Sequence, residues 1–309
     1  MATAGCVCAG TMNNTGYPNA KPFGVVKGKG FMPLVADDGT RNGIDASSLT
    51  LEADILAAVN NIDPSKRLYL FTNIQNASAP EADPNYATSD LNERYKTSEG
   101  ITNVLWEQWG VTEQFFDKVQ SQCVSFGEYE IDVCGNLKGQ KEGTMLYPRP
   151  VNKSSYNAKF QGTTAATQSM VSFNYDYEYT TNDGNQWQIA AAAFGVNNPL
   201  ELKSLIDVNL VITPTTATDM TVVASFDYGY ANAATPWQGA LPTDFTGANL
   251  TTPAVIAIAS VTATATAGTY TVVTLAQATN DICTLTAFRA ASGTIVNGYE
   301  SAATNYTAL

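Results

Sequence analysis

Carboxylates spaced two residues apart are the side chains of this sequence most suited to chemistry. They are Glu128, Glu130, Asp132, Asp176 and Glu178. Because successive side chains of a strand point to opposite faces, we expect each set to share the polar face of a predicted strand. Paired carboxylates supply the acid, base and nucleophile of glycoside hydrolysis. Acidic residues along a strand are more commonly a solvated surface, and we interpret these residues in that way.

A second candidate is the polar turn from Asp37 to Asp45, which matches part of a calcium-binding loop. Counted from Asp38, Thr40 and Asn42 offer oxygen ligands at the expected spacing. The third position is not acidic, however, and Leu49 stands where the loop needs a bidentate glutamate. We therefore interpret the segment as a polar turn between a strand and a helix.

Cysteine chemistry has little support. The cysteines are Cys6, Cys8, Cys123, Cys134 and Cys283. Their odd number and irregular spacing argue against a disulfide framework. The first two are too close together for a zinc knuckle and have no second pair. Cys123 and Cys134 flank a predicted hairpin arm, where we expect two half-buried thiols.

The 309 residues include no histidine. This removes the usual general base and the commonest metal ligand at once. We therefore expect no enzyme and no cofactor, and we predict no catalytic, cofactor-binding or metal-binding residue.

The charge balance restricts the partners. The net charge is −12, and charged residues are 14% of the chain, well below the roughly 25% of a typical soluble domain. A surface that holds DNA phosphates needs clustered Lys and Arg, so this is not expected. An acidic surface can still face DNA by repelling it. The hydrophobic content of 44% is enough for a folded core.

Neither targeting nor membrane insertion is predicted. Residues Met1 to Gly10 lack the basic start of a signal peptide, and no apolar run approaches the ~18 residues of a membrane span. We expect a protein that is made in a cytoplasm, has no membrane anchor and stays soluble until it assembles.

Periodicity and turn residues divide the chain into residues 1–200 and 201–309, with the boundary near Asn197-Asn198-Pro199. Residues 1–30 are rich in Gly, Asn and Pro and are predicted to be an extended arm. The polar segment Asn76 to Asn92 is equally consistent with an arm that reaches another subunit and with a surface loop. The first domain is predicted to contain strands at Phe31–Ala36, Arg67–Ile74, Tyr95–Trp109, Phe126–Val133 and Met170–Tyr179, and helices at Ser48–Asn61 and Thr112–Cys123.

The second domain is predicted from short alternating segments separated by Gly and Pro. Its expected strands are Leu205–Thr213, Thr221–Phe226, Ala254–Thr262, Tyr270–Leu275, Ile282–Arg289 and Thr294–Tyr299. Six or seven strands in about 100 residues are typical of an immunoglobulin-like sandwich. The Cys…Trp…Cys pattern of true immunoglobulin domains is missing.

Four segments carry a family resemblance: Leu34–Asp45, Asp63–Arg67, Phe126–Leu137 and Met170–Phe173. Through them, roughly residues 25–190 resemble the tail tube (major tail) proteins of tailed bacteriophages, and most of all the larger ones in phages of Bacteroidota-type hosts. The resemblance implies a mainly β fold: a rolled β-sheet with a flanking helix, followed by a C-terminal immunoglobulin-like domain. It also implies six-membered rings that stack into a tube for DNA, and it transfers no site residue.

Three functions are weighed against each other. The first is a virion subunit that forms stacked rings with copies of itself, meets other tail or neck proteins and lets DNA pass without specific binding. The second is another virion component, such as a capsid decoration or a fibre, or a bacterial surface adhesin. The third is an enzyme, such as a glycosidase that uses Glu128 and Glu130. The absent histidine and sparse charge favour the first.

Overall fold

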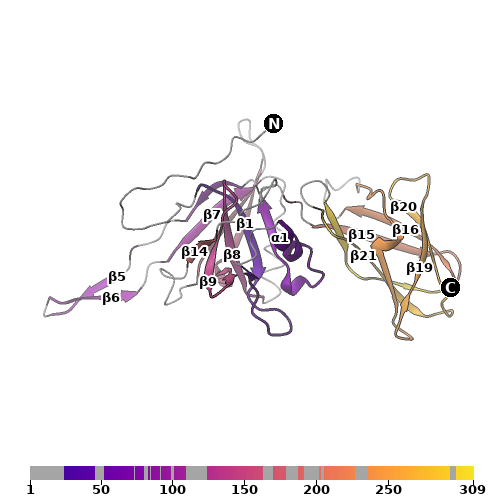
Figure 1. Cartoon of the computed structure of the whole chain (residues 1–309), viewed down its shortest axis with the longest axis horizontal. Helices are drawn as coiled ribbons and strands as arrows, with labels where there is room; N and C mark the ends of the chain where they lie inside the picture. The colour runs from indigo at the N-terminus through magenta and orange to yellow at the C-terminus, as the bar shows by residue number, and fades with distance from the viewer. Residues whose placement is uncertain are drawn as a thin grey trace. The chain divides into compact units, whose positions relative to one another are not determined.

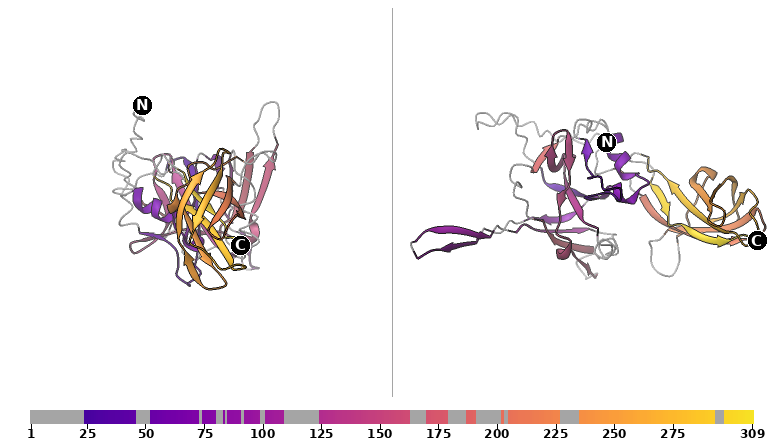
Figure 2. Two further views of the ribbon diagram at one scale, coloured as in Figure 1. Left: turned by 90° about the vertical axis from the view of Figure 1, so that its right-hand side faces the viewer. Right: turned by 90° about the horizontal axis from the view of Figure 1, so that it is seen from below.

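The computed structural model describes residues 24–45, 52–72, 74–79, 83, 85–90, 92–98, 101–108, 124–162, 170–178, 187–190, 202, 205–226, 235–292 and 297–309. The chain is mainly β, which confirms the predicted class. It divides into two compact units, Met1–Leu202 and Lys203–Leu309 (Figures 1 and 2). The predicted boundary lies two residues earlier.

The described part of unit 1 contains two larger sheets, a two-stranded hairpin and a helix. The first sheet has the order β2 (Ile44–Asp45), β10 (Met145–Tyr147), β9 (Leu137–Glu142), β8 (Phe126–Asp132), β1 (Val26–Pro33) and β3 (Tyr69–Thr72), with β11 (Arg149–Pro150) on β8 and β14 (Trp187–Ala190) on β9. The second sheet has the order β12 (Asn157–Gln161), β13 (Met170–Asp176), β7 (Asn103–Gln108) and β4 (Gln75–Ser78). The helix α1 spans Glu52–Val59. Short 3-10 turns lie at Pro64–Lys66 (η1) and Lys153–Ser155 (η2).

The first sheet is the middle layer of unit 1. On one face, Tyr129 and Ile131 of β8 pack with Ile55 and Val59 of α1. On the other face, an aromatic core joins the first sheet to the second. Trp106 of β7 is fully buried there, with its ring centroid 4.3 Å from that of Phe173 and 6.2 Å from that of Phe31. Burial on both faces is expected for a sheet that is covered on both sides.

Strand β8 is the best-covered strand of unit 1. It pairs with β1 along its length, with β11 at Gly127 and Glu128, and with β9 at Glu130 and Ile131. All seven of its residues are buried. Every polar side chain on this strand must therefore find a partner inside the protein.

Several predicted elements of unit 1 need correction. Strand β1 begins at Val26, so the end of the predicted arm belongs to the buried sheet. The predicted loop at Asn76–Asn92 includes most of β4 and all of β5 (Asn85–Thr88). The predicted strand Tyr95–Trp109 is divided between β6 (Arg94–Ser98) and β7, and β6 pairs with β5 in a hairpin of its own. The predicted helix Thr112–Cys123 lies outside the described residues.

Unit 2 is a sheet that nearly closes on itself. Its order is β18 (Ala254–Ile256), β17 (Phe245–Asn249), β21 (Ile282–Arg289), β22 (Gly298–Ser301), β15 (Leu205–Pro214), β16 (Asp219–Phe226), β20 (Thr269–Thr274) and β19 (Ile258–Ala263), with β23 (Thr304–Thr307) on β21 and a 3-10 turn, η4, at Pro242–Asp244. Strands β18 and β19 are separated by Ala257 alone, so one segment of chain joins the two ends of the order. The side chains within this curl form one core, which includes Trp237, Val222, Leu285 and Tyr270.

Candidate functional site

The most unusual feature of unit 1 is a charged cluster between its two sheets. In the β1–β8 ladder, Lys29 lies opposite Glu130, and Phe31 lies opposite Glu128. Alternation along the strands therefore directs Lys29, Glu128 and Glu130 towards the second sheet. Their exposed fractions are 1%, 0% and 6%. We call Lys29, Glu128, Glu130, Lys138 and Tyr175 the buried charge network.

The charges of the network are matched. The Lys29 Nζ donates to Glu128 Oε1 and lies 3.1 Å from Glu130 Oε1. The Lys138 Nζ of β9 lies 3.2 Å from the other oxygen of Glu130, Oε2. Two cations and two carboxylates thus face one another, as buried charges require.

A tyrosine of the second sheet completes the coordination of Glu128. The Tyr175 hydroxyl donates to Glu128 Oε2 over 2.6 Å, and it accepts from the Trp106 indole Nε1 over 2.9 Å. Each Glu128 oxygen therefore has its own donor, one from each sheet. The network fixes the two sheets in one relative position, which apolar packing alone specifies less sharply.

The two carboxyl groups are driven in opposite directions by their surroundings. Burial raises the pKa of Glu128 above its ordinary value, although Lys29 opposes the shift. Burial alone would raise the pKa of Glu130 too, but Lys29 and Lys138 together hold it below its ordinary value. Burial would lower the pKa of Lys29, but Glu128 and Glu130 raise it. Burial, with the charge of Glu128, raises the pKa of Tyr175 well above its ordinary value, so its hydroxyl remains a donor.

The expectation that Glu128, Glu130 and Asp132 form a solvated face is therefore wrong. The second sheet covers that face, and Asp132, 0% exposed, serves the β8–β9 turn. Its Oδ1 accepts from the backbone N–H of Cys134 and of Asn136, and its Oδ2 accepts from the backbone N–H of Gly24. The other two predicted carboxylates differ: Asp176 is half-buried and Glu178 is exposed.

The structure brings Glu128 and Glu130 together as predicted, but it adds a partner that the sequence analysis missed. Lys29 had been assigned to the arm. The available signal was its alternation with Phe31, which places a charged residue on the same strand face as an aromatic one. A glycosidase needs its carboxylates in an open cleft with room for a sugar, whereas these two are closed in by Lys29 and the second sheet.

The Asp37–Asp45 turn uses its polar groups internally. The Asp38 Oδ1 accepts from the Thr40 backbone N–H over 2.9 Å, and Oδ2 pairs with Lys66 Nζ at 2.6 Å. The Asn42 amide donates to two backbone carbonyls, those of Pro33 and Ser65. Within the described part of the chain, no group of three or more Cys, Asp and Glu side chains is placed to hold a metal ion.

Of the cysteines, Cys6, Cys8 and Cys123 lie outside the described residues. Cys283 is a buried free thiol in the core of unit 2. Cys134 is half-buried in the β8–β9 turn, where its backbone N–H donates to Asp132.

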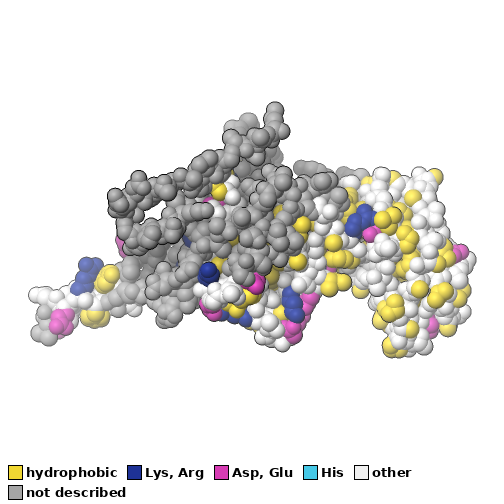
Figure 3. Space-filling model, in the orientation of Figure 1, with side chains coloured by type: hydrophobic (Ala, Val, Ile, Leu, Met, Phe, Trp, Pro, Cys, Tyr) yellow, Lys and Arg dark blue, Asp and Glu magenta, His cyan; other side chains and the backbone are white. Residues whose placement is uncertain are grey.

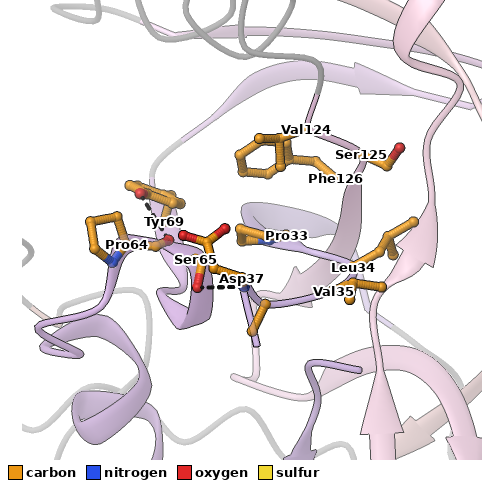
Figure 4. Close-up of a pocket in the computed structure, with 11 residues that line it drawn as sticks. Pro33, Leu34, Val35, Asp37, Pro64, Ser65, Tyr69, Val124, Ser125 and Phe126 are labelled. Atoms are coloured by element: carbon orange, nitrogen blue, oxygen red, sulfur yellow. Dashed lines mark hydrogen bonds between the residues drawn. The ribbon is translucent and has the colours of Figure 1, made fainter. Parts of the chain in front are cut away.

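A pocket of about 430 Å³ lies where β1 ends, beside η1 and the start of β8 (Figure 4). Its described lining is Pro33, Leu34, Val35, Ala36, Asp37, Pro64, Ser65, Tyr69, Val124, Ser125 and Phe126. The Ser65 Oγ accepts from the Asp37 backbone N–H, and the Tyr69 hydroxyl donates to the Pro64 carbonyl (Figure 4). Asp37 is the only charged residue of this lining, so the pocket has no acid–base pair for catalysis.

The second sheet has two unlike faces. One face is the aromatic core. The other face is mostly polar but includes Leu105 and Met170, and its polar side chains are Asn103, Glu107, Ser172, Asn174, Asp176, Asn157 and Lys159. The Asn103 amide ties two strands together by donating to Asn174 Oδ1 and Asp176 Oδ1, both over 2.8 Å. We call this surface the polar sheet face. Its charged residues in the described strands are Glu107, Asp176 and Lys159 alone.

At its edge, the second sheet leaves a large apolar side chain uncovered. In the described part of unit 1, β12 pairs with β13 on one side and has no neighbouring strand on the other. Its Phe160, opposite Val171, lies on the side of the aromatic core but is 64% exposed. Among the described strands, the aromatic core therefore ends at β12, where the apolar surface of another chain can pack against Phe160.

The β5–β6 hairpin also presents aromatic side chains. Tyr86 and Tyr95 are about half exposed, at 48% and 54%. The Arg94 guanidinium lies 4.1 Å above the Tyr86 ring. Exposed aromatic and Arg residues are typical of interaction surfaces.

Comparison with known proteins adds no relative. No protein-family model, no curated protein and no solved structure matches this chain. No helix in the described residues is long and apolar enough to cross a membrane.

Proposed function

We propose that this chain is the tail tube subunit of a tailed bacteriophage, and that copies of it form rings, with six as the expected number, which stack into a tube for DNA. The observation that carries the proposal is the second sheet of unit 1. It combines an anchored core face, a polar face of low charge and an edge strand with an exposed aromatic residue. These are the features that a subunit of a continuous β-walled tube needs.

The edge strand supports ring formation. An exposed strand edge next to apolar surface is a ready site for pairing with another chain, and soluble monomers usually protect such edges. A neighbouring copy that pairs with β12 would cover Phe160 and extend the aromatic core. The opposite edge of the same sheet is β4. A contact from β12 of one copy to β4 of the next is head-to-tail and can close into a ring.

The polar sheet face suits the inside of such a tube. It is hydrophilic, and its three charges nearly cancel, so it offers DNA no cluster of cations. Tight binding to phosphates rests on such clusters, and a lining without them leaves DNA free to move. Because Glu128, Glu130 and Asp132 are buried, they cannot contribute to an acidic lining. Glu107 and Asp176 are the described acidic residues on this face.

We assign unit 2 in this proposal to an immunoglobulin-like domain displayed on the outside of the tube. Its strands, antiparallel except for the β15–β22 pair, surround a single core, and this arrangement and the size of the unit support that assignment. A location inside the lumen would obstruct DNA. The expected location of the protein is accordingly the virion, with synthesis in the host cytoplasm and contacts to other tail or neck proteins.

A second candidate function, a fibre or adhesin role carried by unit 2, rests on the outer face of its sheet. Four threonines are aligned across neighbouring strands: Thr213, Thr221, Thr271 and Thr262. Beside them, Val211 and Val223 are cross-strand partners that are 61% and 42% exposed. Hydrophobic and uncharged side chains predominate on the unit 2 surface seen in Figure 3. A surface of this kind, with exposed apolar side chains and few charges, is suited to contact with another macromolecule.

Electron microscopy of the purified protein tests the proposal. We expect rings or tubes from the full chain and isolated particles from Phe160→Glu, because a carboxylate at the β12 edge cannot enter an apolar contact. The matched control is Val255→Glu, which places the same charge on a residue of unit 2 that is 83% exposed. Both variants should melt like the original protein. If Phe160→Glu assembles normally, or if the full chain gives only monomers, the β12 ring contact is wrong.

A further inference from the structure

The buried charge network brings together the parts of a condensation reaction. Lys29 offers an amine, and Glu128 offers a carboxyl group in direct contact with it. Both side chains are essentially inaccessible to water. Glu130 contacts the same nitrogen and is separately paired with Lys138. An ion pair on a surface has none of this enclosure.

We propose that Lys29 and Glu128 become joined by an intramolecular amide bond between Nζ and Cδ, which cross-links β1 to β8. The site is a self-modification site, and it needs no cofactor and no second protein. It stands independently of the tube proposal.

The atoms of the step balance. One proton of the Lys29 ammonium group first passes through Glu130 to Oε1 of Glu128, which leaves a neutral amine and a neutral carboxylic acid. The amine nitrogen then attacks Cδ of Glu128, so that the Nζ–Cδ bond forms while the bond from Cδ to Oε1 breaks. Of the three protons on the ammonium group, one remains on the amide nitrogen and two leave with Oε1 as water. Glu130 relays a proton to the departing oxygen and ends ionised, as it began. Nothing is oxidised or reduced.

Each neighbour has a role that follows from its contacts. Glu130 touches the attacking nitrogen and acts as the general base. The Tyr175 hydroxyl donates to Oε2, the oxygen that stays, and so stabilises the negative charge that develops there during the attack. Trp106 positions Tyr175 by donating to its oxygen. The opposite pKa shifts of the two carboxyl groups agree with these roles, because the electrophile is favoured as the neutral acid and the base as the carboxylate.

Formation of the amide bond also lowers the number of charges that are buried in the network. Before the step, the network buries two cations and two anions, each of which has lost its hydration. Afterwards, only Glu130 and Lys138 remain charged, and they are already paired. The new amide oxygen keeps the hydrogen bond from Tyr175. A covalent link between neighbouring strands also restricts the unfolded chain.

Intact-mass spectrometry of the folded, full-length protein, denatured for the measurement, tests the inference. We expect a mass below that of the sequence by one water, about 18 Da, and a branched peptide after proteolysis that joins the segments around Lys29 and Glu128. Lys29→Arg and Glu130→Gln should restore the full sequence mass, since the first lacks the amine and the second the base. The control Lys141→Gln, which replaces an exposed lysine of β9 outside the network, should keep the loss. An unmodified wild-type mass overturns the proposal, and so does a water loss that maps elsewhere or persists in Lys29→Arg.

Discussion

Removing the buried ammonium group of Lys29 is the most informative perturbation of unit 1. In Lys29→Met, the side chain keeps similar length and volume but loses its charge. Glu128 and Glu130 then lose the cation that lies between them. Removing one member of a buried pair costs roughly 3–5 kcal/mol, because the remaining charge stays desolvated. In a unit of about 200 residues, this corresponds to a fall in Tm of roughly 6–20 °C.

The control is Lys138→Met. Lys138 also pairs with Glu130, but its side chain is 25% exposed, so solvent screens the contact and the loss should stay near or below about 1 kcal/mol. Thermal unfolding is followed by tryptophan fluorescence in a Trp237→Phe background, so that buried Trp106 reports on unit 1 without a signal from the core of unit 2. The prediction holds whether Lys29 is an ion-pair partner or is joined to Glu128, because the substitution leaves Glu128 as an unpaired buried carboxyl in both cases. The intact mass of the original protein, recorded before the melting experiment, shows whether Lys29 is an ion-pair partner of Glu128 or is joined to it by an amide bond.

The loss of stability in Lys29→Met should depend on pH, and the pKa of the buried carboxyl groups determines in which direction. Without Lys29, burial raises the pKa of Glu128 unopposed by that cation, while Glu130 keeps Lys138 as its partner. A group with a raised pKa in the folded state favours folding at low pH, and this contribution disappears as the pH rises through the raised pKa. The deficit of Lys29→Met should therefore be larger at pH 8 than at pH 5. A variant that melts with the original protein at pH 8, or whose deficit grows on acidification, would refute the burial of these carboxylates.

Three further outcomes follow from local geometry. Tyr175→Phe leaves Glu128 Oε2 and the Trp106 indole N–H without their shared hydroxyl, so urea unfolding should show a loss of about 1.5–3 kcal/mol. Gly268→Ala should destabilise unit 2 by more than the ~1 kcal/mol expected for Gly239→Ala. Both glycines have positive φ, but an added Cβ at Gly268 lies 2.6 Å from the Pro236 side chain, whereas one at Gly239 has no neighbour within 4 Å. Equal losses of stability in melting curves would contradict this. A fragment of residues 203–309 should unfold cooperatively on its own, because its core lies within the unit, and a fragment without a melting transition would show that unit 1 is needed for its fold.

Several strands of unit 2 were predictable because apolar and polar residues largely alternate in them, although the predicted strand Ala254–Thr262 is divided between β18 and β19 and β23 was missed. Strand β21 was predicted with the bounds that the structure gives, Ile282–Arg289, and its Cys283, Leu285 and Ala287 all face the core. Strand β17, Phe-Thr-Gly-Ala-Asn, was missed because it has a single large apolar residue and an internal glycine. That glycine, Gly247, lies against Ile256, where a Cβ would come within 2.9 Å of the isoleucine side chain. The strand is therefore fixed by tertiary packing that local propensity does not record.

In unit 1, the periodicity of β8 correctly separated its two faces, yet the polar face was interpreted wrongly. Alternation shows that Glu128 and Glu130 point the same way, but it does not show which surface lies over them. That depends on two strands that are distant in the sequence: β7 begins 23 residues before the start of β8, and β13 ends 44 residues after the end of β8. Lys29 was missed for a related reason, since the glycines around it suggested a loose arm and outweighed its alternation with Phe31. Those glycines lie in a strand, where Gly30 is close to Leu68 and Tyr129.

The buried network also changes what the net charge of the chain means. Lys29 and Lys138 balance Glu128 and Glu130, so their burial removes four charged side chains from the surface and leaves the net charge of −12 on the remaining residues. The acidity that should keep subunits soluble and DNA mobile is thus carried by residues outside β8. On the polar sheet face it amounts to Glu107 and Asp176 against Lys159, which is close to neutral. In the proposed tube, DNA would therefore slide because the lining lacks cations, and strong repulsion by an acidic wall is not required.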